Sequence, residues 1–74
     1  MWKKGFLKIG ECVLRYSAKV YDEPSEFGIE EGRISKLEVR NEGKLIINYD
    51  RGWDVKPADE LAETALMMIL DYFK

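Results

Sequence analysis

The sequence predicts an α+β domain: a four-stranded antiparallel β-meander with one C-terminal helix packed on one face, in the order β-β-β-β-α. Two turn signals, Gly10-Glu11 and Asn41-Glu42-Gly43, each lie between segments in which apolar and polar residues alternate. The C-terminal segment instead repeats its apolar residues at helical spacing. Residues 1–74 should form a single small domain, because a chain of this length buries only about 60% of its unfolded surface and cannot divide that into two cores.

The Gly10-Glu11 signal predicts a hairpin between residues 2–9 and 12–21. Glycine at the first central position suits a two-residue type II′ turn, which fixes the register of the two strands. One face of this hairpin is then almost entirely apolar. On that face Tyr16 lies opposite Gly5, where its ring can cover the bare glycine backbone.

Asn41-Glu42-Gly43 predicts a second hairpin, between residues 34–40 and 44–50. A three-residue loop with glycine in the left-handed position of a bulge places Val39 opposite Leu45. Counting outward from this pair again separates an apolar face from a polar one, which favours one continuous sheet of four strands.

Residues 57–73 are predicted to be helical, with Pro57 in the first turn and acidic residues at the positive end of the helix dipole. The apolar arc of this helix should cover the apolar sheet face, while Met67 and Leu70 fall outside the arc or on its border. The predicted core comprises Leu7, Ile9, Cys12, Leu14, Tyr16, Ala18, Val20, Leu37, Val39, Leu45, Ile47 and Tyr49 from the strands and Leu61, Ala65, Ile69, Tyr72 and Phe73 from the helix.

Charge is unevenly distributed along a chain whose net charge is −2. The first 20 residues carry a surplus of positive charge, and the next 13 carry a surplus of negative charge. A field of one sign over the whole protein is therefore not available to steer a polyanion.

Composition excludes several classes of protein. Histidine is absent and Cys12 is the only cysteine, so we expect no internal disulfide and neither the commonest general base nor the commonest transition-metal ligand. The longest apolar run, residues 65–70, is far shorter than the roughly 20 residues that span a bilayer. We expect a cytoplasmic protein with no membrane partner, no metal and no cofactor.

The sequence does not favour catalysis. Its serines lack a base partner, and its glycines are too scattered for a phosphate-binding loop. One sheet layer and one helix should leave little room for a pocket of several hundred Å3, the size that small-molecule sites need. Cys12 lies on the predicted core face, where it should pack as a small hydrophobe. We therefore expect that the protein is not an enzyme.

A long acidic connection, residues 22–33, joins the two predicted hairpins. The spacing of its carboxylates does not match a calcium-binding EF-hand loop. We expect the connection to fold back over Trp2 and Phe6 and to protect Phe27 and Ile29 from solvent. The alternative, in which it extends away, leaves that face of the first hairpin open.

Two blocks of the chain, Gly32-Arg33-Ile34-Ser35-Lys36-Leu37 and Asn48-Tyr49-Asp50-Arg51-Gly52-Trp53-Asp54, carry a family resemblance. They resemble a family of short uncharacterised proteins from Gram-positive bacteria and their phages or other mobile elements. The resemblance implies a small cytosolic accessory protein and supplies no catalytic or binding residue. Since phage proteins of this kind often inhibit host machinery, it also implies a candidate inhibitor of a host defence protein.

Three places on the predicted surface favour a protein partner. The turn at residues 50–54 combines an arginine, a tryptophan and two carboxylates, a composition typical of interface hot spots. The acidic connection adds exposed carboxylates, and the helix leaves apolar side chains outside its packing face. The candidate protein-binding residues are Asp50, Arg51, Trp53, Asp54, Glu26, Glu30, Met67 and Leu70. The alternative for the turn is structural, with Trp53 closing the core and Arg51 bridging a neighbouring carboxylate.

A different surface, the reverse face of the first hairpin, favours nucleic acid. Aromatic rings alternate there with cations, as in proteins that bind single strands by stacking on bases and pairing with phosphates. The candidate nucleic-acid-binding residues are Trp2, Lys4, Phe6, Lys8, Arg15 and Lys19. The alternative is an ordinary basic solvent face that the acidic connection covers.

From the sequence we expect a non-enzymatic protein-interaction module whose partner is either a foreign protein or a second copy of the chain in a homodimer. A phage or mobile-element inhibitor of a host protein is one form of this expectation. The alternative function is a small nucleic-acid-binding protein. We rank it second because the net charge opposes binding to a polyanion.

Overall fold

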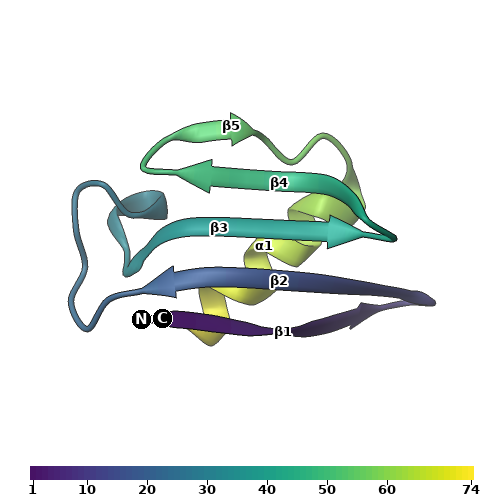
Figure 1. Ribbon diagram of the computed structural model, residues 1–74, viewed down its shortest axis with the longest axis horizontal. Coiled ribbons are helices and arrows are strands. Elements are labelled where there is room, and N and C mark those ends of the chain that lie inside the picture. Colours follow the sequence, from purple (N-terminus) through teal and green to yellow (C-terminus); the bar gives the residue numbers. More distant parts are fainter.

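The computed structural model describes all residues from 1 to 74 and contains one antiparallel sheet with one α-helix across its rear face (Figure 1). The five strands follow one another in chain order, β1-β2-β3-β4-β5, so that every neighbour in the sheet is a neighbour in sequence. The elements are β1 (Trp2–Ile9), β2 (Cys12–Val20), the short 3₁₀ helix η1 (Ile29–Glu31), β3 (Ile34–Asn41), β4 (Lys44–Asp50), β5 (Trp53–Val55) and α1 (Glu60–Tyr72).

The predicted α+β class, antiparallel meander and C-terminal helix are confirmed, but the strand count of four is wrong. The chain reverses after β4, where the Asp50 N–H donates to the Gly52 carbonyl and Arg51 adopts a left-handed backbone with φ of 60°. Trp53 then pairs with Tyr49, and the returning segment becomes the fifth strand.

The first hairpin has the predicted register in every pair, from Trp2 opposite Lys19 to Ile9 opposite Cys12. Gly10 has φ of 61°, as a type II′ turn requires at its first central position. The Tyr16 ring covers Gly5 so closely that a Cβ atom at that glycine would lie 2.8 Å from the Tyr16 hydroxyl oxygen.

The predicted register of the second hairpin is wrong. Its turn has two residues, Glu42 and Gly43, and both have positive φ, as in a type I′ turn. A bulge then leaves Ile46 without a partner, because Arg40 pairs with Leu45 and the next pair is Val39 with Ile47. The bulge places Leu45 opposite Arg40 and turns Ile46 against the core. The predicted register instead places Leu45 on the core face and Ile46 on the polar face.

The core lies between the sheet and α1 and largely agrees with the prediction. Leu45 and Tyr72 are exceptions, since Leu45 is displaced by the bulge and Tyr72 is exposed at the end of the helix. Ile29, Ile34 and Ala62 are buried but were not part of the predicted core, although Ile29 was expected to be protected from solvent. The fully buried cluster comprises Leu14, Ala18, Val20, Ile29, Ile34, Leu37, Val39, Ile47, Tyr49, Ala62, Ala65 and Ile69.

The helix begins three residues later than predicted. Asp59 has extended backbone angles, and its carboxylate accepts a hydrogen bond of 2.9 Å from the Ala62 N–H. It is therefore the N-cap, and Pro57 precedes the helix instead of occupying its first turn. The structure contains no helix that is long and apolar enough to cross a membrane.

Candidate functional site

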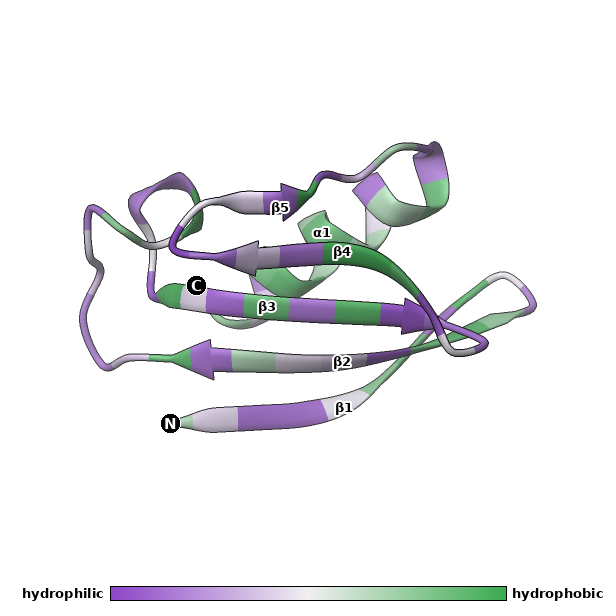
Figure 2. Ribbon diagram, turned by 45° about the horizontal axis from the view of Figure 1, so that its top comes forward, coloured by the Kyte–Doolittle hydropathy of each residue, from purple (hydrophilic) through white to green (hydrophobic).

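The face of the sheet opposite α1, here called the open face, is not covered by any element (Figure 1). Polar and apolar residues alternate along the strands, as Figure 2 shows for β3, and this alternation assigns side chains to the two faces. On the open face, the strand registers align three cross-strand rows, which are Trp2-Lys19-Lys36-Asp50, Lys4-Ser17-Glu38-Asn48 and Phe6-Arg15-Arg40-Leu45.

The open face carries an excess of positive charge although the whole chain is acidic. Its six cations are Lys4, Lys8, Arg15, Lys19, Lys36 and Arg40. The two carboxylates that β3 and β4 contribute to this face are each in an ion pair, Asp50 with Lys36 at 3.7 Å and Glu38 with Arg40 at 2.9 Å. The remaining four cations, all from the first hairpin, form no ion pair, and they give the face a local field that the net charge conceals.

Aromatic rings stand among these cations. Trp2 is 51% exposed and Phe6 is 67% exposed, on the same strand as Lys4. The Arg15 guanidinium lies 5.9 Å from the centre of the Phe6 ring. The sequence prediction that these aromatic and basic residues share one face is therefore confirmed by the register.

The prediction that the acidic connection covers Trp2 and Phe6 is wrong. The connection lies at the end of the sheet (Figure 1), because Ile29 is buried in the core and the Tyr49 hydroxyl donates a 2.9 Å hydrogen bond to the Phe27 carbonyl. Phe27 is exposed instead of protected, whereas Ile29 is protected as expected but by the core and not by Trp2 and Phe6. None of the carboxylates in the connection forms an ion pair with a lysine or arginine of the open face.

Three adjoining hollows mark the open face. The first, of about 370 Å3, lies beside Phe6, Arg15 and Arg40. The second, of about 590 Å3, lies beside Trp2 and Lys36 and shares Lys4, Ser17 and Glu38 with the first. The third, of about 400 Å3, shares Lys36 with the second and reaches the acidic connection, where it is lined by Lys19, Tyr21, Ser25, Phe27, Ser35 and Arg51.

The positive field is reflected in the titration of Tyr21. The Lys19 ammonium beside it lowers the pKa of the Tyr21 hydroxyl below its ordinary value of 10.0, and Lys36 acts in the same direction. The Ser35 hydroxyl also contributes to the lowered pKa, although its geometry does not meet that of a hydrogen bond.

The turn at residues 50–54 does not form the single hot spot that its composition suggested. Trp53 is half-buried with its ring 5.0 Å from that of Tyr49, so it closes the core as the structural alternative predicted. Arg51 does not bridge a carboxylate, since its guanidinium stacks 4.7 Å from the Phe27 ring. Asp54 stays exposed on β5.

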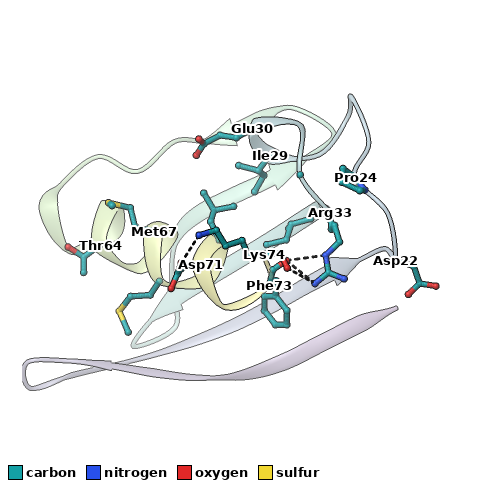
Figure 3. Close-up of a pocket in the computed structure, with 14 residues that line it drawn as sticks. Asp22, Pro24, Ile29, Glu30, Arg33, Thr64, Met67, Asp71, Phe73 and Lys74 are labelled. Atoms are coloured by element: carbon teal, nitrogen blue, oxygen red, sulfur yellow. Dashed lines mark hydrogen bonds and ion pairs between the residues drawn. The ribbon is translucent and has the colours of Figure 1, made fainter.

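A groove of about 1100 Å3 lies on the other side of the molecule, between α1 and the acidic connection (Figure 3). Met67, Leu70 and Glu30 line it, whereas Glu26 does not. The expectation that this fold leaves little room for a hollow of several hundred Å3 is therefore wrong. The groove contains no serine, cysteine or histidine nucleophile, and no group of three or more His, Cys, Asp or Glu residues anywhere in the chain is placed to hold a metal.

A family model described as a domain of unknown function (DUF7678) matches residues 1–74. The chain belongs to the DUF7678 family. Neither the comparison with curated proteins nor that with solved structures found a match. The expectation of an uncharacterised family is thus confirmed over the whole DUF7678 chain, while its association with Gram-positive bacteria and phages stays a prediction.

Sequence reasoning missed Lys36 and Arg40 as parts of the open face of the DUF7678 protein. The signal was present, because Lys36, Glu38 and Arg40 alternate along one predicted strand and so must share a face. What was missing was the register of β2 against β3, which aligns this row with the basic residues of the first hairpin.

Arg33 closes one end of the groove by binding the C-terminus of α1 (Figure 3). Its Nε and one terminal nitrogen donate to the Phe73 carbonyl at 3.2 Å and 3.0 Å, and that nitrogen also reaches the Lys74 carbonyl at 3.3 Å. A cation at this position satisfies free carbonyls and complements the helix dipole.

Arg33→Met should therefore lower the free energy of unfolding by about 1–2 kcal/mol, because it removes charged hydrogen bonds but keeps the apolar stem. Urea unfolding followed by circular dichroism measures this change. Lys74→Met is the matched control, since it removes only an exposed ion pair with Asp71, which contributes less than about 1 kcal/mol. Equal losses in the two variants would contradict the role assigned to Arg33.

Proposed function

We propose that this DUF7678 protein is a non-enzymatic binding module that takes single-stranded nucleic acid on its open face. One observation carries the proposal: four unpaired cations and two exposed aromatic rings share a sheet face that no other element covers. The sequence ranked this function second because the net charge opposes binding to a polyanion and because the acidic connection was expected to cover that face. The position of the connection removes the second objection, and the cluster of unpaired cations on one face supplies the local positive charge that the net charge does not describe.

The chemistry of the face suits a single strand better than a duplex. Unpaired bases expose their ring faces, and stacking on an aromatic side chain is worth about 1–3 kcal/mol per base regardless of sequence. Trp2 and Phe6 are four residues apart on β1, which corresponds to about 13 Å along a strand. Lys4 lies between them, and Arg15 and Lys19 lie opposite them on β2, within reach of phosphates that connect stacked bases.

Fluorescence anisotropy with a labelled single-stranded oligonucleotide of mixed sequence, as DNA and as RNA, tests the proposal. Phosphate contacts release counterions, so four cations should give a slope near −3 in a plot of log affinity against log salt concentration. Trp2 fluorescence in a Trp53→Phe background supplies a second readout, because base stacking on the Trp2 ring should change its emission.

Adjacent lysines on β1 provide a matched pair of variants. Lys4→Gln should weaken binding and make the salt slope shallower by about 0.7, the contribution of one phosphate contact on a single strand. Lys3→Gln should change neither, because Lys3 pairs with Ala18 on the opposite face of the sheet. Phe6→Ala should weaken binding about 5-fold to 150-fold if a base stacks on the ring.

Two results would contradict the proposal. One is the absence of binding at low salt by the folded protein, and the other is an equal effect of Lys3→Gln and Lys4→Gln. The second result would mean that only the overall charge of the chain matters and not the open face.

The groove beside α1 favours a second candidate function, the protein-interaction module expected from the sequence. Met67 and Met68 are exposed on the helix beside Leu70, and methionine is common on adaptable binding surfaces. A homodimer is one form of this candidate and an inhibited host protein is another. A strictly monomeric mass by light scattering at high concentration would reject the homodimer.

A further inference from the structure

The third hollow of the open face has features that the proposed function does not use. It lies where β2 ends and β3 begins, against the acidic connection on one side and the turn between β4 and β5 on the other. A nucleic-acid strand that lies across the open face from Phe6 past Trp2 would have its terminus at this hollow.

The hollow has a surplus of positive charge. Lys19, Lys36 and Arg51 line it. Lys19 and Arg51 form no ion pair, and the only carboxylate paired to this group is Asp50, which lies 3.7 Å from Lys36. Three cations against one carboxylate leave about two positive charges for a ligand.

Ser35 supplies an independent indication of a ligand. Its residue is only 6% exposed, and its hydroxyl oxygen Oγ is buried without a hydrogen-bond partner, although the side chain lines the hollow. Leaving a buried hydroxyl unpaired costs about 1–3 kcal/mol, and such groups in native proteins are exceptions that call for an explanation. The Tyr21 hydroxyl, whose pKa the Ser35 hydroxyl lowers, lies outside hydrogen-bond geometry, so an acceptor oxygen that enters the hollow between these side chains would satisfy the Ser35 hydroxyl.

The backbone of Arg51, which also lines the hollow, is strained. Arg51 has φ of 60°, a left-handed conformation that costs a residue with a side chain about 1–2 kcal/mol. Its N–H donates to the Ser35 carbonyl at 3.1 Å, so the strained turn is held against the strand that carries the unpaired hydroxyl. Strain of this kind tends to occur at ligand sites.

The walls of the hollow are aromatic. The Phe27 ring packs under the Arg51 guanidinium, and the Lys19 ammonium lies 5.5 Å from the centre of the Tyr21 ring. Both cations are thereby held at the hollow by ring faces, which leaves their N–H groups free to donate to a ligand. Both rings are also exposed and can contact the sugar or base next to a bound anion.

We propose that this hollow binds a phosphate monoester, namely the terminal phosphate of the single strand that lies on the open face. The assignment rests on the proposed function and adds that the protein recognises a strand end. A phosphate monoester carries about −1.5 to −2 charges at neutral pH and has three acceptor oxygens, which match two surplus cations and the Ser35 hydroxyl. An internal phosphodiester carries one charge and matches them less well.

The test compares oligonucleotides of one sequence and length with a 5′-phosphate, a 3′-phosphate or no terminal phosphate. We expect one phosphorylated form to bind about tenfold more tightly than the form without terminal phosphate, the effect of one charge-assisted hydrogen bond. Ser35→Ala and Arg51→Gln should each reduce this preference and leave binding of the unphosphorylated form almost unchanged. Ser35→Ala removes an unpaired buried hydroxyl, so it is not expected to destabilise the fold.

Arg40→Gln is the control. Because Arg40 lines the first hollow, this substitution should change the affinity for all three oligonucleotides by the same factor. If all forms bind with the same affinity, the terminal-phosphate site is wrong and the proposed function stands. If no form binds, the proposed function itself is wrong. If the preference survives both variants of the hollow, the phosphate is bound elsewhere and the assignment is overturned.

Discussion

Replacing Leu14 with alanine should lower the free energy of unfolding by about 2–5 kcal/mol, the usual cost of a cavity left by a buried leucine. Leu14 is 0% exposed and lies on β2 between Leu7 of β1 and Asn41 of β3. The strands on both sides are held by backbone hydrogen bonds, so the site has little freedom to collapse around the smaller side chain. We therefore expect the cavity to persist and its full cost to appear in the free energy of unfolding.

The expected loss is a large part of the total stability. A domain of this length has about 4–11 kcal/mol of unfolding free energy in total. Leu14→Ala should shift the urea midpoint strongly, and Ile69→Ala in α1 should do the same because Ile69 is also buried in the core. Unchanged melting of both variants would contradict the core that the structure places between sheet and helix.

The neighbouring residue provides the control for this experiment. Val13 is on the same strand but is 52% exposed on the open face, so Val13→Ala should cost less than about 1 kcal/mol. Comparable losses in Val13→Ala and Leu14→Ala would mean that the two faces of β2 are not distinguished as the register requires.

The first hairpin could be predicted from the sequence because its register depends on one local choice. Gly10 in the first central position admits a type II′ turn, and every pair then follows by counting. The second hairpin offered two local choices, a three-residue loop or a type I′ turn at Glu42-Gly43. The structure adopts the type I′ turn and absorbs the extra residue in a bulge at Ile46, which the turn sequence alone does not encode.

The fifth strand and the acidic connection depend on contacts that are distant in sequence. Trp53–Val55 is too short to show strand periodicity, and it becomes a strand only because Tyr49 and Asn48 are available at the edge of β4. Ile29 could have packed on either face of the sheet. Its burial beneath α1 with Ile34 decided the position of the connection, and hence whether the open face was free.

The composition of the candidate site was predictable, but its extent was not. The basic and aromatic residues of the first hairpin follow from strand alternation. The third hollow joins residues from β2, β3, the acidic connection and the turn after β4, so it exists only once the whole sheet is assembled.

The acidic connection contains a close backbone contact that leads to a second large effect. A Cβ atom at Gly28 would overlap with the Gly32 carbonyl oxygen and would lie 2.9 Å from its carbonyl carbon. These are backbone atoms, so a rotamer change cannot relieve the overlap. The Gly32 carbonyl also accepts a 3.0 Å hydrogen bond from the Ser25 N–H, and this bond would be lost if the carbonyl moved.

Gly28→Ala should therefore lower the free energy of unfolding by about 1–3 kcal/mol from the overlap alone. If η1 moves enough to withdraw Ile29 from the core, lost burial adds up to about 3 kcal/mol. Urea unfolding measures the total, and hydrogen exchange of the amides of residues 25–32 should show that the loss begins in the connection. Gly52→Ala is the control, since Gly52 has a negative φ and no atom within 4 Å of an added Cβ.

Gly28→Ala also separates stability from binding, because the connection lies beside the third hollow but not beside the first. If the connection loosens without unfolding the sheet, the four unpaired cations of the open face stay in place, and affinity for an unphosphorylated oligonucleotide should be nearly unchanged. The preference for a terminal phosphate should fall, since Phe27 would no longer be held by the Tyr49 hydroxyl and could not support Arg51. Equal exchange rates in Gly28→Ala and Gly52→Ala would show that the connection tolerates the added methyl group, and the close packing of Gly28 against Gly32 would be wrong.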